Sequence, residues 1–396
     1  MKRFFTVTLV VFLFTSCADE VLKRADESNV INISASVANS TRVSTDIRNL
    51  ESFQLYGLHN GSDMLMDKVV VSRDEMESST GWSYSPVTYW PRKGSINFFA
   101  VGDAPYGGGE HFASDFFYSR DKGAYLTYAA LDNDGDGMVK GVYDVTYAVN
   151  LEEATRNIPV QISFRHATSQ LVFQFRNNIP NLQIFVEDIR IENIKGAGCY
   201  TLPSSTTSVD NNSVKGGWNL DYFAGTEFDR LVTYDVDIKA SSDNWLALPS
   251  GGNTIRYPKV MASTEVSIGD KTIVDDGYVN IVPQPINPWD SENDPTNQNN
   301  GSLFLLKIKI MDGETCIWPR FEAGIKGADV GTDWIAVPTK HAFIKEWHEG
   351  RRYIYTFIFN KGVGGLIPPT DKIEPGQPVL VPGIKVDKDV SVLPLQ

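Results

Sequence analysis

Apolar and polar residues alternate along much of the chain, and a period of two residues is typical of β strands that bury one face. Segments rich in Val, Ile, Phe and Tyr recur between turn-forming residues, whereas apolar residues at helical spacing are scarce. We therefore expect an all-β fold organised as two β-sandwich domains in tandem. The clearest predicted strands are Phe53–Leu58, Ser95–Val101, Gly123–Ala129, Gln161–Phe164, Gln170–Arg176, Leu182–Ile194, Leu231–Ile238, Leu303–Met311 and Arg352–Phe359.

Helical patterns are confined to two short segments, Ser72–Ser79 and Leu151–Asn157. Clusters of Gly and Pro such as Pro105–Gly109 mark turns, and the polar run Asn287–Ser302 predicts an exposed loop. A charged connector, Glu152–Pro159, precedes a new set of strands. It predicts the boundary between a first sandwich over residues 49–157 and a second over residues 158–362.

The start of the chain has a different pattern, in which two basic residues precede an unbroken apolar segment, Phe4–Phe14. This segment is too short to span a bilayer and is typical of a secretory signal peptide, which we place at residues 1–16. The small pair Thr15-Ser16 precedes Cys17, and the arrangement resembles the lipobox of bacterial lipoproteins, whose cysteine carries the lipid anchor. The acidic pair Asp19-Glu20 resembles a surface-export tag. The alternative is an ordinary signal peptide followed by an incidental cysteine.

A half-buried first strand is predicted soon after this leader. Its alternating apolar residues are Ile31, Ile33, Ala35 and Val37. The strand is followed by a polar, turn-forming stretch that contains Arg42, and Arg48 lies a few residues further on. Polar turns of this kind are accessible parts of a fold.

The end of the chain predicts a spacer followed by a last strand, over residues 363–396. Several prolines between residues 363 and 383 make the spacer stiff. The last strand has one polar face and one apolar face that is interrupted by Lys388, and the apolar residues are Ile384, Val386, Val390 and Val392. A strand of this kind suits donation to a groove on another molecule. The alternative is an edge strand that folds onto its own domain.

The composition of the chain limits the classes of molecule that it is expected to bind. The 396-residue chain has 36 basic and 49 acidic residues and a net charge of -13, which disfavours binding to phosphate backbones. We therefore expect no nucleic-acid partner. Besides Cys17 there are Cys199 and Cys316, which are too few for a disulfide scaffold and are expected to be buried thiols, although they can also pair.

Candidate chemistry is limited to one acidic loop. Carboxylates occupy alternate positions, at Asp132, Asp134 and Asp136, and the glycine that follows allows the chain to turn, as in the calcium loop of an EF-hand. At the position where that loop needs a bidentate Glu, this chain has Tyr143. The alternatives are a structural calcium site and an acidic turn between strands. The histidines are scattered, so no catalytic triad can be placed, and His166 is interpreted as a structural histidine in the core or on the surface and not as a metal ligand. We expect no other cofactor and no enzyme.

A series of short motifs runs nearly from end to end of the chain. The first half contains Tyr89-Trp90-Pro91, Ile96–Ala100, Tyr143–Ala148 and Phe164–Ser169. The second half contains Ile191–Tyr200, Trp218, Ile281–Gln284, Trp347–Gly350 and Tyr353–Tyr355. In this order, and together with the lipobox, the motifs resemble the fimbrillin-like family of Bacteroidales, which are the subunits of type V pili. The aromatic residues of these motifs are also the residues that we expect in the cores, namely Trp90, Phe98, Phe99, Trp218 and Trp347.

The resemblance implies two β-sandwich domains, no catalysis and a place in a fimbria on the cell outer membrane, supporting adhesion. In this family an outer-membrane protease of trypsin-like specificity cuts after an arginine; Arg42 matches that position best and Arg48 second. The cut would remove the lipid-anchored segment 17–48 with its first strand and open a groove for a donated strand. The implied partners are other fimbrial subunits, the outer membrane through palmitate-type lipid on Cys17, and host or bacterial surface ligands. Stalk, tip and anchor positions all stay open.

A second interpretation is a surface glycan-binding lipoprotein of a polysaccharide-uptake system, similar to the starch-utilisation accessory proteins. The two interpretations differ in what the fold must present. A binding module needs exposed aromatic platforms, whereas a pilus subunit needs one strand to donate and one to lose.

Overall fold

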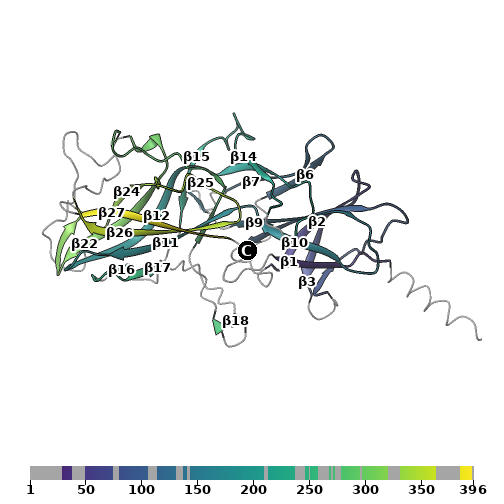
Figure 1. The fold of residues 1–396 in the computed structure, drawn as a ribbon, viewed down its shortest axis with the longest axis horizontal. Helices are drawn as coiled ribbons and strands as arrows, with labels where there is room; N and C mark the ends of the chain where they lie inside the picture. Colours follow the sequence, from purple (N-terminus) through teal and green to yellow (C-terminus); the bar gives the residue numbers. More distant parts are fainter. Residues whose placement is uncertain are drawn as a thin grey trace, which may run out of the picture.

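The computed structural model describes residues 29–37, 50–74, 80–105, 114–130, 137–140, 143–208, 213–236, 246–248, 250–256, 267–268, 271–272, 278–294, 297–319, 331–362 and 384–394. Strands make up most of these ranges, and the helical element among them is a 3₁₀ turn, η2 (Gln298–Asn300). The all-β prediction is confirmed. In the same ranges, no helix has both the length and the apolarity needed to cross a bilayer. The N-terminal and C-terminal strands lie toward opposite ends of an elongated molecule (Figure 1).

The N-terminal half is built on a seven-stranded sheet that closes around a core. Its strands in spatial order are β1 (Ile33–Val37), β10 (Val160–His166), β9 (Tyr143–Glu153), β5 (Ile96–Pro105), β2 (Ser52–His59), β3 (Asp63–Arg73) and β4 (Trp82–Tyr84). Every strand contributes to one buried cluster, which includes Ile33 from one end of the sheet and Trp82 from the other. The two ends also meet, because the Tyr84 hydroxyl in β4 donates to the Ile31 carbonyl just before β1 over 2.7 Å.

A four-stranded sheet covers the outer face of β2, β5 and β9. Its strands in order are β14 (Gly217–Asn219), β13 (Ala197–Thr201), β7 (Gly123–Ala129) and β6 (Ser114–Ser119). The core between the sheets is aromatic, and the rings of Tyr147 and Tyr200 lie 5.0 Å apart in it. Since β13 and β14 come from later in the chain, the first half is completed by strands of the second.

The C-terminal half is a sandwich of two sheets around one apolar core. One sheet has the order β17 (Thr254–Arg256), β11 (Ser169–Asn177), β26 (Arg351–Lys361) and β27 (Ile384–Pro394), with β20 (Tyr278–Ile281) also paired to β11. The other has β23 (Thr315–Trp318), β22 (Leu303–Asp312), β12 (Leu182–Lys195), β15 (Leu231–Asp235) and β8 (Val139–Lys140), with β16 (Leu246–Leu248) beside β12 and β24 (Asp333–Pro338) beside β22. Two small pairs complete the described strands, β18 (Ser267–Ile268) with β19 (Lys271–Thr272) and β21 (Gln284–Pro285) with β25 (Glu346–Trp347).

The chain passes from the first half to the second just after β10. β10 pairs with β9 and β1, whereas β11 belongs to the C-terminal sandwich. The connector Glu152–Pro159 therefore joins two strands of one sheet. The change of sheet comes at Ala167 and Thr168, between β10 and β11.

A buried polar network occupies this junction. Nδ1 of His166 and Oδ2 of Asp144 lie 2.9 Å apart, and the Thr168 hydroxyl donates to Oδ1 of Asp144 over 2.8 Å. Gln170 donates to the same carboxylate over 3.4 Å and accepts a hydrogen bond of 2.7 Å from Nη2 of Arg352 in β26. His166 is 6% exposed, so of the two structural places expected for it, core and surface, it takes the core.

The helix predicted over residues 151–157 is wrong, and so is the start of the helix predicted over residues 72–79, of which residues 75–79 lie outside the described residues. Residues 151–153 are the end of β9, and residues 72–73 are the end of β3. Glu153 pairs with Ile96 of β5, and Arg73 pairs with Trp82 of β4. Pairing with a neighbouring strand has overridden a weak local helical preference in each case.

The predicted core residues are largely confirmed. Trp90, Phe98, Phe99 and Trp347 are buried, and Trp218 packs half-buried against the second core. Cys199 and Cys316 are buried free thiols, as expected. The predicted exposed loop 287–302 departs from expectation at Trp289, which is 1% exposed and anchors the loop on the protein.

Candidate functional site

The first strand occupies a slot at the closure of the seven-stranded sheet. β1 runs parallel to β10, from Ile33 opposite Val160 to Val37 opposite Phe164. Ile31, just before the strand, and Ile33 are 0% and 1% exposed, and Ala35 packs partly buried against the same core. The alternating pattern predicted for residues 31–37 is therefore a strand with one buried face.

The second wall of the slot is made by the segment that follows β4. The Ile31 amide donates to the Thr88 carbonyl and the Trp90 amide donates to the Asn29 carbonyl, each over 2.9 Å. Tyr84 adds the hydroxyl contact that closes the sheet. Removal of this strand would expose an apolar groove and leave backbone groups without partners along both walls, which is the arrangement that accepts an added strand.

The last strand lies on its own domain. β27 pairs antiparallel with β26, from Ile384 opposite Lys361 to Pro394 opposite Arg351 (Figure 1). Of the predicted apolar face, Ile384 is buried and Val386 and Val390 pack partly buried against the core, whereas Val392 is 40% exposed. The contact with the core thus weakens toward the end of the strand, and the other long edge of β27 has no partner strand among the described elements.

Lys388 is the weak position in the middle of this contact. Its Nζ donates to the Pro338 carbonyl, so the side chain faces the domain and not the solvent. Burial lowers the pKa of Lys388 to about 8, although the neighbouring carboxylate of Asp387 acts in the opposite direction. A lysine in this environment binds less firmly than an apolar residue would, because desolvation of its charge is costly.

Several predicted site residues lie outside the described residues. These are the lipidation candidate Cys17, the processing candidates Arg42 and Arg48, and the acidic loop residues Asp132, Asp134 and Asp136. Among the residues that the structure describes, no group of three or more His, Cys, Asp or Glu could hold a metal ion. Lipidation, processing and calcium binding stay predictions.

The sequence did not predict the residues that form the second wall of the slot. Asn29, Tyr84 and Thr88 contact the first strand from a distant part of the chain, and their residue types carry no signal of that role. The Tyr89-Trp90-Pro91 motif is the one local signal, because it lies along this wall and Trp90 packs under the slot.

Comparison with known proteins gives one family. A family model described as fimbrillin-like matches residues 41–375. No curated protein matches the chain.

Several solved structures are also similar. A candidate cell adhesion protein from Bacteroides uniformis is 10% identical, with a TM-score of 0.43, and the match covers 93% of this chain and 99% of that one. Another from Bacteroides eggerthii is 12% identical, with a TM-score of 0.40 and coverage of 92% and 98%. A tip fimbrial protein from Porphyromonas gingivalis, solved with a C-terminal truncation, is 12% identical, with a TM-score of 0.34 and coverage of 91% and 98%.

Proposed function

Because the chain belongs to the fimbrillin-like family, we propose that it is a subunit of a cell-surface fimbria, exported as a lipoprotein and assembled by exchange of strands. The proposed role is structural, in support of adhesion, and the proposed location is the outer surface of the cell outer membrane, held at first by lipid on Cys17. The partners that follow from this role are other fimbrial subunits.

The main support for this proposal is the slot that β1 occupies. β1 is short and fills a groove whose walls come from β10 and from residues 84–90. Cleavage after Arg42 or Arg48 would detach the whole strand together with Cys17. The groove left behind would present an apolar floor and unpaired backbone groups to an incoming strand.

β27 is the proposed donor. Among the described strands, β26 is the one that holds it on its own domain, and its inward face contains the poorly accommodated Lys388. Its departure would leave the rest of the C-terminal core in place, since β27 is the outermost strand of its sheet. The same alternation that seats Ile384, Val386 and Val390 on β26 would seat them in the slot of the next subunit.

N-terminal sequencing of subunits taken from native fibres tests the processing step. If Arg42 is the site, we expect a mature N-terminus at Val43, which Arg42→Ala should abolish. If Arg48 is the site, we expect a mature N-terminus at Asn49, which Arg48→Ala should abolish. Arg92→Ala is a matched control, because Arg92 is an exposed arginine in the same half of the molecule. An N-terminus at acylated Cys17 in subunits along the fibre would contradict the mechanism.

Deletion of residues 385–396 tests donation. We expect a folded monomer that no longer polymerises, with polymer length measured by electron microscopy and gel electrophoresis. The double variant Val386→Asp/Val390→Asp should have the same effect without shortening the chain, because charged residues on the inward face cannot enter an apolar groove. Fibres of ordinary length from both variants would refute donation by β27.

A further inference from the structure

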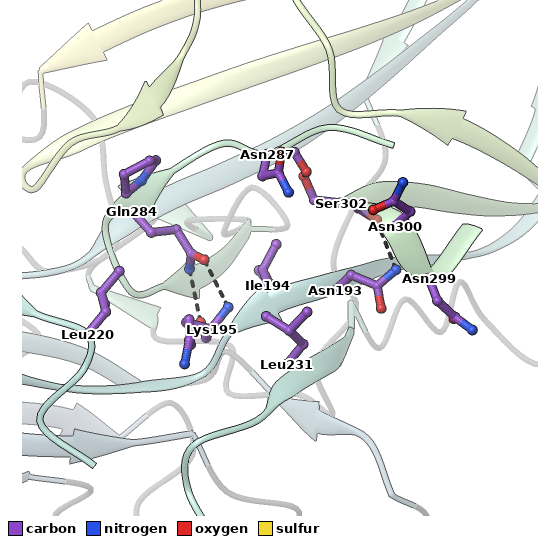
Figure 2. A pocket seen from close by; sticks show the side chains of 12 residues that line it. Asn193, Ile194, Lys195, Leu220, Leu231, Gln284, Asn287, Asn299, Asn300 and Ser302 are labelled. Carbon is purple, nitrogen blue, oxygen red and sulfur yellow. Dashed lines mark hydrogen bonds between the residues drawn. The ribbon is translucent and has the colours of Figure 1, made fainter. Parts of the chain in front are cut away.

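A pocket of about 260 Å³ lies in the C-terminal half, where β12 and β15 approach the segment that follows β20 (Figure 2). This is room for several water molecules. Its apolar part is formed by Ile194, Leu220 and Leu231. Its polar part is dominated by side-chain amides, and Figure 2 shows these around the same opening.

Two of the amides hold the pocket in shape. Oε1 of Gln284 accepts the Lys195 amide over 2.8 Å, and its Nε2 donates to the Lys195 carbonyl over 2.9 Å. Nδ2 of Asn193 donates to the carbonyls of Gln298 and Gly301 over 2.8 and 2.9 Å. These bonds tie β12 to the two segments opposite it, so the pocket is formed before any ligand enters.

Three further amides are available to a ligand. The side chains of Asn287, Asn299 and Asn300 line the pocket and are exposed, and none has a hydrogen-bond partner among the described residues. Each amide offers both donors and an acceptor, which is what a hydroxyl group also needs from its partner. Three free amides above an aliphatic floor suit a ligand with several hydroxyl groups and one apolar face.

The charged groups around the pocket disfavour the binding of ionic ligands. Lys195 is the charged residue of the lining, and its Nζ is paired with Oδ1 of Asp229 at 2.6 Å. No carboxylate lines the pocket to bind a cation. The net charge of -13 repels anions in general. An uncharged ligand is therefore favoured.

A row of aromatic rings begins beside the pocket. Leu220 and Leu231 both line it, and the segment between them carries Tyr222, Phe223 and Phe228. The Tyr222 and Phe223 rings lie 5.0 Å apart, and those of Phe223 and Phe228 lie 5.3 Å apart.

The row continues onto the outer face of the four-stranded sheet. The Tyr222 ring lies 6.2 Å from that of Tyr125 in β7, which stacks on Phe117 of β6 at 5.3 Å. Phe117, Tyr222 and Phe228 are 43%, 38% and 42% exposed. Exposed aromatic side chains that touch one another form a patch rather than isolated surface residues, and such patches mark binding sites. An exposed aromatic platform of this kind is the feature expected of a glycan-binding module.

We propose that the pocket and the aromatic row together bind an uncharged glycan. One sugar ring enters the pocket, where its hydroxyl groups bond to Asn287, Asn299 and Asn300 and its apolar face rests on Leu220 and Leu231. Neighbouring sugar rings stack on the aromatic row. No residue of β1 or β27 lines the pocket or belongs to the aromatic row, so we expect glycan binding not to depend on strand exchange.

The first test is an array of uncharged oligosaccharides of glucose, mannose, galactose and N-acetylglucosamine, printed beside their sialylated and sulfated counterparts. The purified monomer is the analyte, which separates the result from any effect of polymerisation. We expect binding to uncharged glycans and weaker binding to the charged forms. Absence of binding to every uncharged glycan, or binding restricted to the charged ones, would overturn the proposal.

Variants then locate the site, with the best uncharged oligosaccharide titrated by calorimetry. Asn299→Leu/Asn300→Leu should weaken binding at least tenfold, because both amides bond to the ligand. Tyr222→Ala/Phe228→Ala should weaken binding of the oligosaccharide but not of its single terminal sugar. Asn253→Leu and Phe343→Ala are matched controls at exposed positions outside the site and should leave affinity unchanged. Undiminished affinity of the Asn299→Leu/Asn300→Leu variant would refute the pocket.

Discussion

Glu349 is a half-buried acid that links the two halves of the molecule. It lies in the turn between β25 and β26 and hydrogen-bonds with Tyr200 of the four-stranded sheet. Burial raises the pKa of Glu349 to about 7 from 4.5, against the lowering effects of Tyr200, Lys215 and Arg165. Between these two values the folded chain holds a proton that the unfolded chain has lost. The free energy of unfolding therefore falls as the pH rises through this window, and the loss is complete above it.

We expect Glu349→Gln to raise the free energy of unfolding by about 2 kcal/mol at pH 8 and to leave it nearly unchanged at pH 4. An amide keeps the size and the hydrogen bond of the protonated acid but carries no charge to desolvate. Urea unfolding at both pH values measures the difference, with Glu314→Gln as an exposed control. Equal stability of the variant and the parent protein at pH 8 would contradict this account.

Asp144 anchors the polar network between β10 and β11, where it accepts from His166, Thr168 and Gln170. Replacement of Asp144 by Ala leaves these buried groups short of an acceptor, and we expect a loss of about 2–4 kcal/mol in the free energy of unfolding. Thr168→Val removes one donor and should cost about 1 kcal/mol. Urea unfolding measures both, and the exposed Asp115→Ala serves as control. A loss of less than about 1 kcal/mol in Asp144→Ala would show that the network does not stabilise the junction.

How firmly β27 is held on its own domain depends on Lys388, the one inward-facing residue of the strand that is not apolar. Burial lowers the pKa of Lys388 to about 8 from 10.5. Between these values the unfolded chain holds more protons than the folded chain, so burial of this side chain becomes less costly as the pH rises. At neutral pH the charged form is present and weakens the docking of β27.

We expect Lys388→Met to hold β27 more firmly at pH 7 and to slow its exchange into another subunit. Hydrogen exchange of the β27 amides should slow by roughly tenfold, since about 1.4 kcal/mol corresponds to that factor. Lys361→Met is the control, because Lys361 is exposed at the end of β26. Faster exchange, or faster polymerisation, in Lys388→Met would show that the lysine stabilises the docked strand.

The whole molecule is expected to be less stable once it has lost its first strand. A chain that begins at Val43 and ends at Gly383 lacks both β1 and β27, and its first core has an open groove. A synthetic peptide of residues 384–394 should bind that groove and raise the melting temperature. At about 100 times its Kd the peptide adds about 2.7 kcal/mol.

The matched control is the same peptide with Asp in place of Val386 and Val390, which should have no effect. Because the shortened chain also lacks its own β27, hydrogen exchange must show where the peptide sits. Protection of β10 amides supports filling of the slot, whereas protection confined to β26 would mean that the peptide only replaces the missing last strand.

Much of the fold was predictable because strand patterning is local. The alternation at residues 31–37 and 384–392 marked both terminal strands, and Gly123–Ala129 coincides with β7. The errors at residues 72–73 and 151–153 have the same physical cause, since both segments are strand ends whose state is set by distant neighbours. The pocket had no local signal, because Asn193, Gln284 and Asn299 come from three separate segments.

The sequence by itself determined that this protein is made of strands and which faces of the first and last strands are apolar. These are properties of neighbouring residues and follow from a period of two. Only the tertiary structure decided that β1 closes a sheet beside β10, that β27 lies on β26 with Lys388 facing the domain, and that the aromatic row meets an amide-lined pocket. Each of these depends on pairing between residues far apart in the chain. Such pairing is settled by the packing of whole sheets, which no local pattern records.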